Sequence, residues 1–279
     1  MESRRWLVSG ASSGLGWELA QLLVDRGEIV VGTVRKDSDA QRLLALGSSA
    51  HVVQVDLTDP TERVVAAVRA TLDRIGGLDV LVNNAGYGLV GAIEESSEDE
   101  ARHQMETNFW GPWKLIRATL PALRESSDAR IVNVSSTAGF YGVAAMGIYN
   151  ASKFALEGMS HALSLELANH GIGVTIVEPG AFRTEWAGGG LRFSETSLPE
   201  YADSAAGKVR GGISHLDGRQ AGDPRRAAEA LVTLAEATDP PLRLPLGADA
   251  VSALRKHLSR TSEELDAWAA VAESTGFSE

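Results

Sequence analysis

Short apolar runs alternate with longer amphipathic stretches along almost the whole chain. Most of these runs are continuous in Val, Ile and Leu rather than alternating with polar residues, which is typical of strands buried on both faces of a parallel sheet. We predict strands at Arg4–Ser9, Glu28–Val34, His51–Val55, Leu78–Val82, Arg130–Val134, Gly173–Val177 and Leu242–Leu246. Pro245 in the last run indicates an edge strand, because proline has no N–H to donate to a neighbour.

The stretches between these runs have helical periodicity. After the first run, Leu15, Leu19 and Leu22 lie on one stripe, and Arg26-Gly27 closes the helix with a basic residue and then a glycine. Repeated strand–helix–strand connections imply right-handed crossovers. We therefore predict one α/β domain over residues 1–279, a doubly wound, Rossmann-type parallel sheet of about seven strands in three α/β/α layers.

Residues 185–222 break this alternation. The segment is rich in Gly, Ser and Asp and has weak periodicity. A stretch of this length with little regular structure is usually a functional lid or disordered. We predict a substrate-binding lid over about 185–222 and a C-terminal helical tail over about 248–279.

Charge and composition exclude several classes of function. The net charge of −11 argues against a nucleic acid or an anionic membrane surface as partner, and the absence of cysteine excludes disulfides and thiolate chemistry. No run approaches the roughly 20 apolar residues of a membrane span, and the apolar stretch at the N-terminus is too short for a signal peptide. We expect a cytoplasmic protein without a metal site, because the six histidines are scattered and the acidic cluster Glu94–Glu100 suits a helix N-terminus.

A glycine-rich loop, Gly10-Ala11-Ser12-Ser13-Gly14-Leu15-Gly16, follows the first predicted strand and opens a helix. Glycines allow a tight turn and close approach to a ligand, and a helix N-terminus offers free N–H groups to a phosphate. The G-x-x-x-G-x-G spacing differs from both the common dinucleotide fingerprint and the P-loop. The alternative is a tight strand–helix turn that needs glycine for its geometry alone. Three glycines at the start of a helix, directly after the first strand, favour a cofactor-binding loop.

The end of the second predicted strand indicates which dinucleotide binds. An acidic residue there would accept hydrogen bonds from the ribose of NAD, whereas an arginine pairs with the extra phosphate of NADP. Arg35 occupies this place and therefore favours NADP(H) over NAD, with a solvated surface cation as the alternative.

Tyr149 and Lys153 lie four residues apart in a predicted helix and so share one face. A phenol with a pKa of about 10 is a poor acid–base catalyst at neutral pH. A nearby ammonium, together with an oxidised nicotinamide, would lower that pKa. The pair is thus a candidate proton donor with its tuning charge.

These motifs together resemble the short-chain dehydrogenase/reductase family, in particular NADP-preferring hydroxysteroid dehydrogenase-like, retinol dehydrogenase-like and carbonyl reductase members. The motifs recur in order across nearly the whole chain: Gly10–Gly16, Asp56, Asn83-Asn84-Ala85-Gly86, Asn108, Ser136, Tyr149-x-x-x-Lys153, Pro179-Gly180 and Thr184. Each is weak alone, and their combination is specific. Ser9 and Phe182 depart from the residues most common in the family, and Phe182 is expected to reshape the pocket.

The resemblance implies a role for each matched residue. The catalytic set would be Asn108, Ser136, Tyr149 and Lys153, with Ser135 as a rival of Ser136 and a backbone-bonding role as the alternative for Asn108. The cofactor would contact Gly10, Ser12, Ser13, Gly14, Leu15, Gly16, Arg35, Asp56, Leu57, Asn83, Ala85, Gly86, Tyr149, Lys153, Pro179, Gly180, Phe182 and Thr184. Family members often pair through the helices that carry Asn108 and Tyr149, which implies a homodimer or homotetramer.

The resulting expectation is an NADPH-dependent, reversible reduction of a ketone or aldehyde, with hydride from the nicotinamide and a proton from Tyr149. The expected substrate is bulky and apolar, because Phe140, Tyr141, Met146, Trp186, Leu191 and Phe193 are candidates to line its pocket or to belong to the core. Two alternatives remain open. One is a non-catalytic NADP(H) sensor, and the other is a non-redox lyase or epimerase on the same fold.

Overall fold

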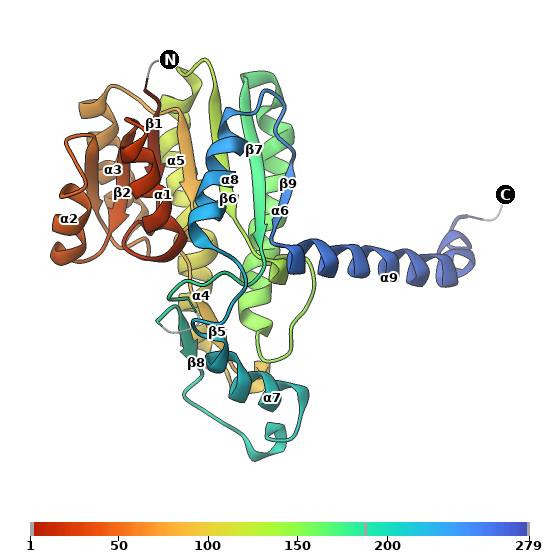
Figure 1. The fold of residues 1–279 in the computed structure, drawn as a ribbon. Coiled ribbons are helices and arrows are strands. Elements are labelled where there is room, and N and C mark those ends of the chain that lie inside the picture. Colours follow the sequence, from red (N-terminus) through yellow and green to blue (C-terminus); the bar gives the residue numbers. More distant parts are fainter. Residues whose placement is uncertain (1–2, 187–188, 278–279) are drawn as a thin grey trace.

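Seven parallel strands form the central sheet in the computed structural model, which describes residues 3–186 and 189–277 (Figure 1). Their spatial order is β3-β2-β1-β4-β6-β7-β9. The strands are β1 (Arg5–Val8), β2 (Ile29–Val34), β3 (Ala50–Gln54), β4 (Val80–Asn83), β6 (Ala129–Val134), β7 (Ile172–Pro179) and β9 (Arg243–Leu246). Each predicted strand is confirmed to within two residues at either end, and β9 with Pro245 lies at an edge.

Helices cover both faces of the sheet, which confirms the doubly wound α/β/α architecture (Figure 1). One face packs against α1 (Gly14–Asp25), α2 (Asp37–Leu44) and α8 (Pro224–Glu236). The other packs against α3 (Thr61–Ile75), α5 (Gly111–Arg124) and α6 (Gly147–Leu167). Successive side chains of β1 point to opposite faces of the sheet. Trp6 and Val8 pack on the face covered by α1, α2 and α8, and Leu7 packs on the face covered by α3, α5 and α6.

A second, two-stranded sheet pairs β5 (Gly88–Val90) with β8 (Leu191–Phe193). Near it lie α4 (Glu98–Met105), a π-helical turn at Glu106–Trp110 and α7 (Ala205–Gly212). Short 3-10 turns occur at Ile93–Glu95, Thr137–Gly139, Ala168–His170, Pro199–Tyr201 and Ile213–Leu216. The expectation of little regular structure in 185–222 is therefore wrong for about half of the segment, while Ala187 and Gly188 lie outside the described residues. Its elements are too short to show periodicity and depend on contacts made elsewhere in the chain.

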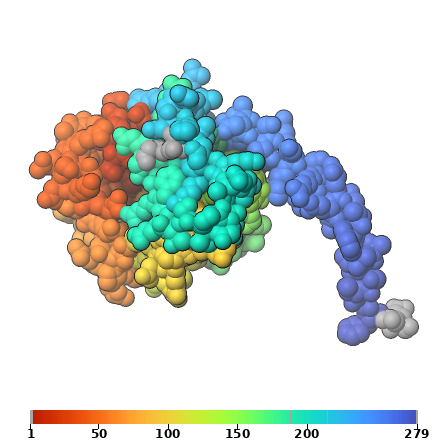
Figure 2. Space-filling model, turned by 90° about the horizontal axis from the view of Figure 1, so that it is seen from below, coloured from red at the N-terminus to blue at the C-terminus, as the bar shows by residue number. Residues whose placement is uncertain are grey.

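The last helix, α9 (Ala248–Glu273), extends away from the rest of the molecule (Figures 1 and 2). Only its beginning is packed, since Ala250 and Leu254 are its buried residues. No helix in the described part of the chain is long and apolar enough to cross a membrane.

Candidate active site and cofactor cleft

A cavity of about 460 Å³ lies at the carboxyl ends of the central strands. It is open between the loops after β1 and β4, where the chain changes direction across the sheet. Ligands of open α/β sheets bind at such switch points. The predicted residues that line the cavity are Gly10, Ser12, Ser13, Gly14, Leu15, Arg35, Asp56, Leu57, Ala85, Gly86, Ser136, Tyr149, Lys153, Pro179, Gly180, Phe182 and Thr184.

The glycine loop packs closely against the chain around it and leaves no room for a side chain at Gly10 or Gly16. Gly10 and Gly14 have left-handed φ angles of 67° and 55°. A Cβ on Gly16 would lie 2.4 Å from the Gly10 carbonyl oxygen and 2.5 Å from the Asn84 side-chain nitrogen. No side chain caps the first turn of α1, so its N–H groups face the cavity without a side-chain partner among the described residues. This cradle suits the phosphates of a dinucleotide.

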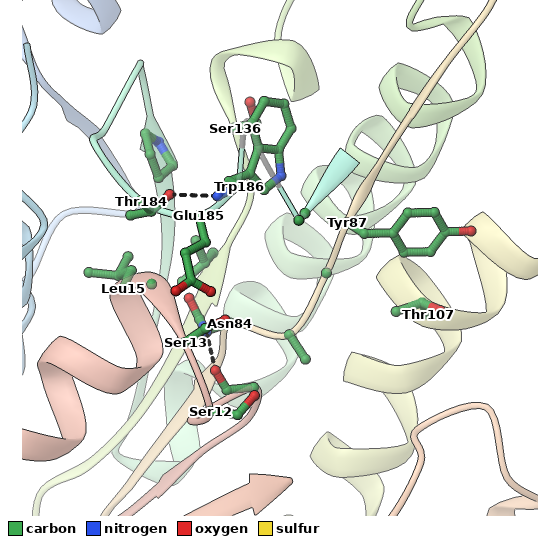
Figure 3. Close-up of a pocket in the computed structure, with 18 of the residues that line it drawn as sticks. Ser12, Ser13, Leu15, Asn84, Tyr87, Thr107, Ser136, Thr184, Glu185 and Trp186 are labelled. Atoms are coloured by element: carbon green, nitrogen blue, oxygen red, sulfur yellow. Dashed lines mark hydrogen bonds between the residues drawn. The ribbon is translucent and has the colours of Figure 1, made fainter. Parts of the chain in front are cut away.

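The loop after β4 fixes the glycine loop from the other side. Asn84 Nδ2 donates to the Ser9 carbonyl at 2.9 Å, and Ser9 Oγ accepts from the backbone N–H groups of Asn84 and Ala85. Asn83 was predicted to contact the cofactor, but its side chain is buried in the sheet, where it donates to Asn133. Asn84, the next residue of the same predicted motif, lines the cavity in its place (Figure 3).

Two guanidinium groups lie near the end of the cleft formed by β2 and β3. Arg35 is 66% exposed and is 4.0 Å from the carboxylate of Asp56. Burial alone would raise the pKa of Asp56, but hydrogen bonds from Thr58 and the nearby Arg35 charge hold it below its usual value. Arg42 was not predicted: it stacks 3.7 Å from the ring of Trp17 and donates to the Ser12 carbonyl at 3.4 Å.

Ser136 and Tyr149 lie beside each other at the far end of the cleft, close enough for their hydroxyl groups to interact. Ser136 follows β6, and its hydroxyl also accepts from the Ala138 N–H at 3.1 Å, which fixes the turn. Tyr149 lies in the first part of α6 and is 5% exposed. The rival Ser135 is directed away from this pair, with its hydroxyl beside the carboxyl group of Glu157. The geometry therefore separates the two serines and brings Ser136 to the tyrosine.

Burial shifts the pKa values of Tyr149 and Lys153 in opposite directions. Burial raises the pKa of Tyr149 to about 12, only partly opposed by the neighbouring Ser136 hydroxyl. Burial lowers the pKa of Lys153 to about 8, and the negative charge of Glu157 opposes this shift. The predicted lowering of the Tyr149 pKa requires an oxidised nicotinamide beside the ammonium; in the chain alone the pKa of Tyr149 is raised. Lys153 Nζ donates to the Val134 carbonyl at 2.9 Å and lies 5.8 Å from the centre of the Tyr149 ring. The desolvation of the Tyr149 hydroxyl outweighs the effect of the lysine charge on the Tyr149 pKa.

Asn108 lies just behind the cavity wall, in the π-helical turn after α4. It is fully buried; its amide oxygen accepts from the Tyr87 N–H, and its amide nitrogen donates to the Tyr87 carbonyl and to Ser152 Oγ. The position of a Cβ on Gly86 would be 3.1 Å from the Asn108 oxygen and 3.6 Å from Lys153 Nζ. Asn108 is thus next to the lysine, although its hydrogen bonds are those of the backbone-bonding alternative. π-turns of this kind are frequent at functional sites.

Of the six apolar candidates for the substrate pocket, Trp186 alone lines the cavity (Figure 3). Ile213 and Leu216 join it from the 3-10 turn after α7. The ring of Trp186 lies 5.8 Å from that of Tyr149. The other candidates do not line it: Phe140 and Tyr141 pack against His257 of α9, Met146 and Leu191 are buried behind the wall, and Phe193 is exposed beside Arg210.

The acidic cluster Glu94–Glu100 holds residues 194–210, which connect the cavity-lining Arg192 to the cavity-lining Ile213. As predicted, it opens a helix, since Ser97 and Glu100 form a capping box at the start of α4. The buried Glu95 accepts from the Leu198 N–H at 2.8 Å and pairs with Arg210 at 3.4 Å. Glu100 accepts from the Glu195 N–H, and Glu94 accepts from the Tyr201 hydroxyl. Sequence reasoning missed these contacts, because the partners are about a hundred residues apart.

Comparison with known proteins agrees with this geometry. Residues 4–190 match the short chain dehydrogenase family model. A 3-ketodihydrosphingosine reductase of Bacteroides thetaiotaomicron is 38% identical over 88% of this chain and 89% of its own length. A short-chain dehydrogenase structure from Streptomyces avermitilis superimposes with a TM-score of 0.91 at 42% identity, covering 99% of this chain and all of that one. A Burkholderia cenocepacia short chain dehydrogenase in complex with NADP gives a TM-score of 0.72 at 27% identity, over 95% and 97% of the two chains.

The glycine loop, the Ser136–Tyr149 pair with its neighbouring lysine, and the match over more than half of the chain lead to one conclusion. This protein belongs to the short-chain dehydrogenase/reductase family of oxidoreductases.

Proposed function

We propose that this protein is an NADPH-dependent carbonyl reductase that also catalyses the reverse oxidation of the alcohol. The observation that carries the proposal is the juxtaposition of the Ser136 and Tyr149 side chains, with Lys153 one helical turn further on, at the end of a cleft that begins in the glycine loop. A protein that only binds a nucleotide needs the loop but needs no buried proton donor beside it.

NADP(H) is the cofactor that fits the cleft best. The loop over Gly10–Gly16 and the uncapped start of α1 would hold the pyrophosphate. Arg35 and the Arg42–Ser12 pair place two guanidinium groups where the extra phosphate of the adenosine ribose would lie. The Burkholderia relative holds NADP, which supports this assignment.

The chemistry divides between the cofactor and the chain. When bound, the dinucleotide supplies the hydride that reaches the carbonyl carbon. The Tyr149 hydroxyl gives its proton to the carbonyl oxygen, and the Ser136 hydroxyl donates a hydrogen bond to the same oxygen as negative charge develops there. The Lys153 ammonium lies beside the tyrosine and stabilises the phenolate that remains.

The substrate class that fits is a ketone with a bulky or long apolar group. Trp186, Ile213 and Leu216 form an apolar wall beside Tyr149. The Bacteroides relative is a 3-ketodihydrosphingosine reductase, so its substrate joins a ketone to a long alkyl chain. The same chemistry in a shorter or cyclic ketone would use the same wall.

Oligomerisation through α6 and the π-turn is part of the proposal. Trp110, Phe154 and Leu165 are 42%, 47% and 71% exposed on these neighbouring elements. Phe154 and Leu165 lie three turns apart on one face of α6. Apolar side chains gathered in this way mark a protein interface.

Replacement of Tyr149 by Phe tests the proposed function. The variant keeps the ring and loses the proton, so we expect kcat for a long-chain 3-keto substrate to fall by about 10² to 10⁴-fold. The dissociation constant for NADPH, from fluorescence titration, should stay within about threefold. If wild type binds NADPH but oxidises none of it with long-chain, aryl or cyclic ketones, the proposal fails and a sensor is favoured.

Replacement of Arg35 by Asp tests the cofactor assignment separately. We expect the preference for NADPH over NADH, measured as the ratio of the two kcat/KM values, to fall by at least about tenfold, because the carboxylate repels the extra phosphate. Arg63→Asp is the matched control, since Arg63 is an exposed arginine in α3 outside the cavity lining. An unchanged ratio in Arg35→Asp would remove Arg35 from the phosphate site.

A further inference from the structure

A buried group of charged side chains lies next to the catalytic end of the cleft, and the chemistry proposed above makes no use of it. Glu157 of α6 and Glu178 of β7 are 4% and 0% exposed. Arg243 of the edge strand β9 donates to both carboxylates, to Glu178 at 2.6 Å. One oxygen of each carboxylate, Oε1 of Glu157 and Oε2 of Glu178, is buried without a well-formed hydrogen bond among the described residues. One guanidinium compensates only one of two negative charges, so the group has room for a further proton.

Glu157 continues the row of side chains that the proposed reaction uses. Tyr149, Lys153 and Glu157 are spaced four residues apart in α6 and therefore lie along one face of the helix. Lys153 is buried, and the negative charge of Glu157 raises its pKa. A change in the charge of Glu157 therefore alters the affinity of Lys153 for its proton.

Ser135 connects these two groups. Lys153 Nζ donates to the Val134 carbonyl at 2.9 Å, and Ser135 is the residue joined to that carbonyl. A Cβ on Gly139 would lie 2.5 Å from Ser135 Oγ and 3.0 Å from Glu157 Oε1, so the two oxygens border the same point. Ser135 is buried, and its hydroxyl has no other partner in residues 3–186 and 189–277. A hydroxyl both accepts and donates, which allows it to pass a proton on.

The proton affinities at the two ends of this route are close to each other. Burial raises the pKa of Glu157 to about 7, although the neighbouring hydroxyl and guanidinium oppose this shift. Burial lowers the pKa of Lys153 to about 8. A proton therefore moves between the carboxylate and the amine in either direction near neutral pH. The titratable and charged groups on the elements around Glu157 are Lys153 and the exposed His161 on α6, Glu178 on β7 and Arg243 on β9.

The group reaches solvent on the side of β9. The side chain of Arg243 is 34% exposed, whereas those of the two glutamates that it binds are buried. Asn108, the polar neighbour of Lys153 on the other side, has both amide hydrogens engaged, by the Tyr87 carbonyl and by Ser152 Oγ. An amide also releases no proton near neutral pH. Of these two neighbours of the lysine, Glu157 is the one that gains and loses a proton.

We propose that Glu157 is a relay residue that returns protons from water to Lys153 by way of the Ser135 hydroxyl. The proposal rests on the proposed reduction, in which Tyr149 gives its proton to the carbonyl oxygen and becomes a phenolate. The Lys153 ammonium gives a proton to the phenolate oxygen and becomes an amine. The Glu157 carboxylate takes a proton from water beside Arg243 and gives it to the Ser135 hydroxyl, which gives its own proton to the amine. Every group ends as it began, and one proton has been taken from water. Glu157 acts through Lys153 and does not line the cavity.

Glu157→Gln tests the relay, with Glu178→Gln as the matched control. Each change replaces a buried carboxylate that Arg243 binds by an amide of the same shape, but Glu178 has no place on the route. For reduction of a long-chain 3-keto substrate by NADPH, we expect kcat to fall by about tenfold or more in Glu157→Gln and to stay within about twofold in Glu178→Gln. KM for the ketone should stay within about threefold in both variants, because neither residue contacts it.

Isotope effects separate a relay from a structural role. Deuterated water slows the return of the proton, whereas NADPH deuterated at the transferred position slows the hydride step. In Glu157→Gln the first effect on kcat should grow and the second should shrink, because the return of the proton has become the slow step. A structural defect would slow the hydride step and keep the second effect large. Ser135→Ala should change both effects in the same direction as Glu157→Gln, and Glu157→Asp should recover part of the lost kcat.

Carbon-13 NMR of the full-length protein, labelled at the glutamate carboxyl groups and free of cofactor, gives a measurement without turnover. The Glu157 signal is identified by its loss in Glu157→Gln, and we expect it to titrate near pH 7 in wild type. A Glu157 that stays ionised down to about pH 5 would overturn the relay, because its proton affinity would no longer match that of Lys153. Equal kcat values and equal isotope effects in the two glutamine variants would overturn it as well.

Tyr149→Phe keeps these outcomes apart from a failure of the proposed function. If Tyr149→Phe is inactive while Glu157→Gln reduces the ketone as fast as wild type, the reduction stands and the relay alone is wrong. If Tyr149→Phe reduces the ketone as fast as wild type, the proposed proton donor is wrong, and the relay fails with it.

Discussion

The wall of the cleft formed by the sheet and the wall formed by residues of the segment 189–220 differ in what holds them in place. In the sheet wall, a Cβ on Gly16 would collide with the Gly10 carbonyl oxygen and the Asn84 side-chain nitrogen, so no spare volume is left. In the other wall, a few hydrogen bonds tie the chain to Glu95 and Glu100. The first arrangement accepts one cofactor geometry, whereas the second can change without disturbing the core. One fold can thus keep a fixed cofactor and vary its substrate.

The largest effect is expected where the sheet wall is tightest. Gly16→Ala would place a methyl group 2.4 Å from the Gly10 carbonyl oxygen, so the glycine loop must move. We expect the dissociation constant for NADPH to rise by roughly a hundredfold, with a loss of stability of about 1–3 kcal/mol. Isothermal titration with NADPH and thermal unfolding measure the two effects.

Gly158→Ala is the matched control for this change. Gly158 also lies within a helix, and a Cβ there would meet no atom within 4 Å. Because Ala is the better helix former, this variant should be as stable as wild type or more so, with NADPH binding unchanged. If Gly16→Ala bound NADPH as tightly as Gly158→Ala, the close packing of the sheet wall would not be what defines the cofactor site.

Sequence reasoning predicted the sheet wall well and the other wall poorly, and the reason is physical. Each strand of the sheet is a local apolar run, and the glycine loop and the Tyr149–Lys153 pair are local motifs. Asn83 and Asn84 were confused because neighbouring residues of a strand point to opposite sides, which a sequence motif does not reveal. β8 has three residues and exists through its pairing with β5, which lies far away in the sequence.

At the catalytic end of the sheet wall, where Tyr149 and Lys153 lie, we expect activity to fall at alkaline pH. Burial lowers the pKa of Lys153 to about 8, whereas that of Tyr149 is raised to about 12. Above about pH 8 the ammonium is lost while the tyrosine keeps its proton. We expect kcat/KM for NADPH, which reports groups of the free enzyme, to fall above pH 8 by up to about tenfold per pH unit.

Glu157→Gln sharpens this test, because the negative charge of Glu157 raises the pKa of Lys153. Its removal should move the alkaline limb to lower pH without removing a residue that contacts the substrate. A limb that stays in place would assign the titration to another group. A profile that is flat to about pH 10 would show that the reaction does not need the charged lysine.

A smaller effect is expected from the anchor of the other wall. Glu95→Ala removes the acceptor of the Leu198 N–H and leaves Arg210 without this carboxylate. The segment 194–210 should then loosen, raising KM for the ketone a few-fold to about tenfold while the dissociation constant for NADPH stays the same. Glu98→Ala is the control, because Glu98 is an exposed partner of Arg102 in α4. If the dissociation constant for NADPH rose as much as KM for the ketone, the two walls would not be independent.

Lowering the pH should also loosen the segment 194–210, without affecting the wall formed by the sheet. The Leu198 hydrogen bond is the main cause that lowers the pKa of Glu95 below 4.5, aided by the Ala92 N–H and Arg210 and opposed by burial. Because the folded-state pKa is the lower one, this carboxylate stabilises the contact fully above about pH 4.5 and loses that contribution as the pH falls through the lowered value. Hydrogen exchange of residues 191–210 should therefore speed up in acid relative to β1 and β4. In Glu95→Gln the extra exchange should already be present at neutral pH and change little with acid, since the amide has no proton to gain. If the wild-type segment kept its protection to the pH at which the central strands open, Glu95 would not be the anchor, and the two walls would unfold as one unit.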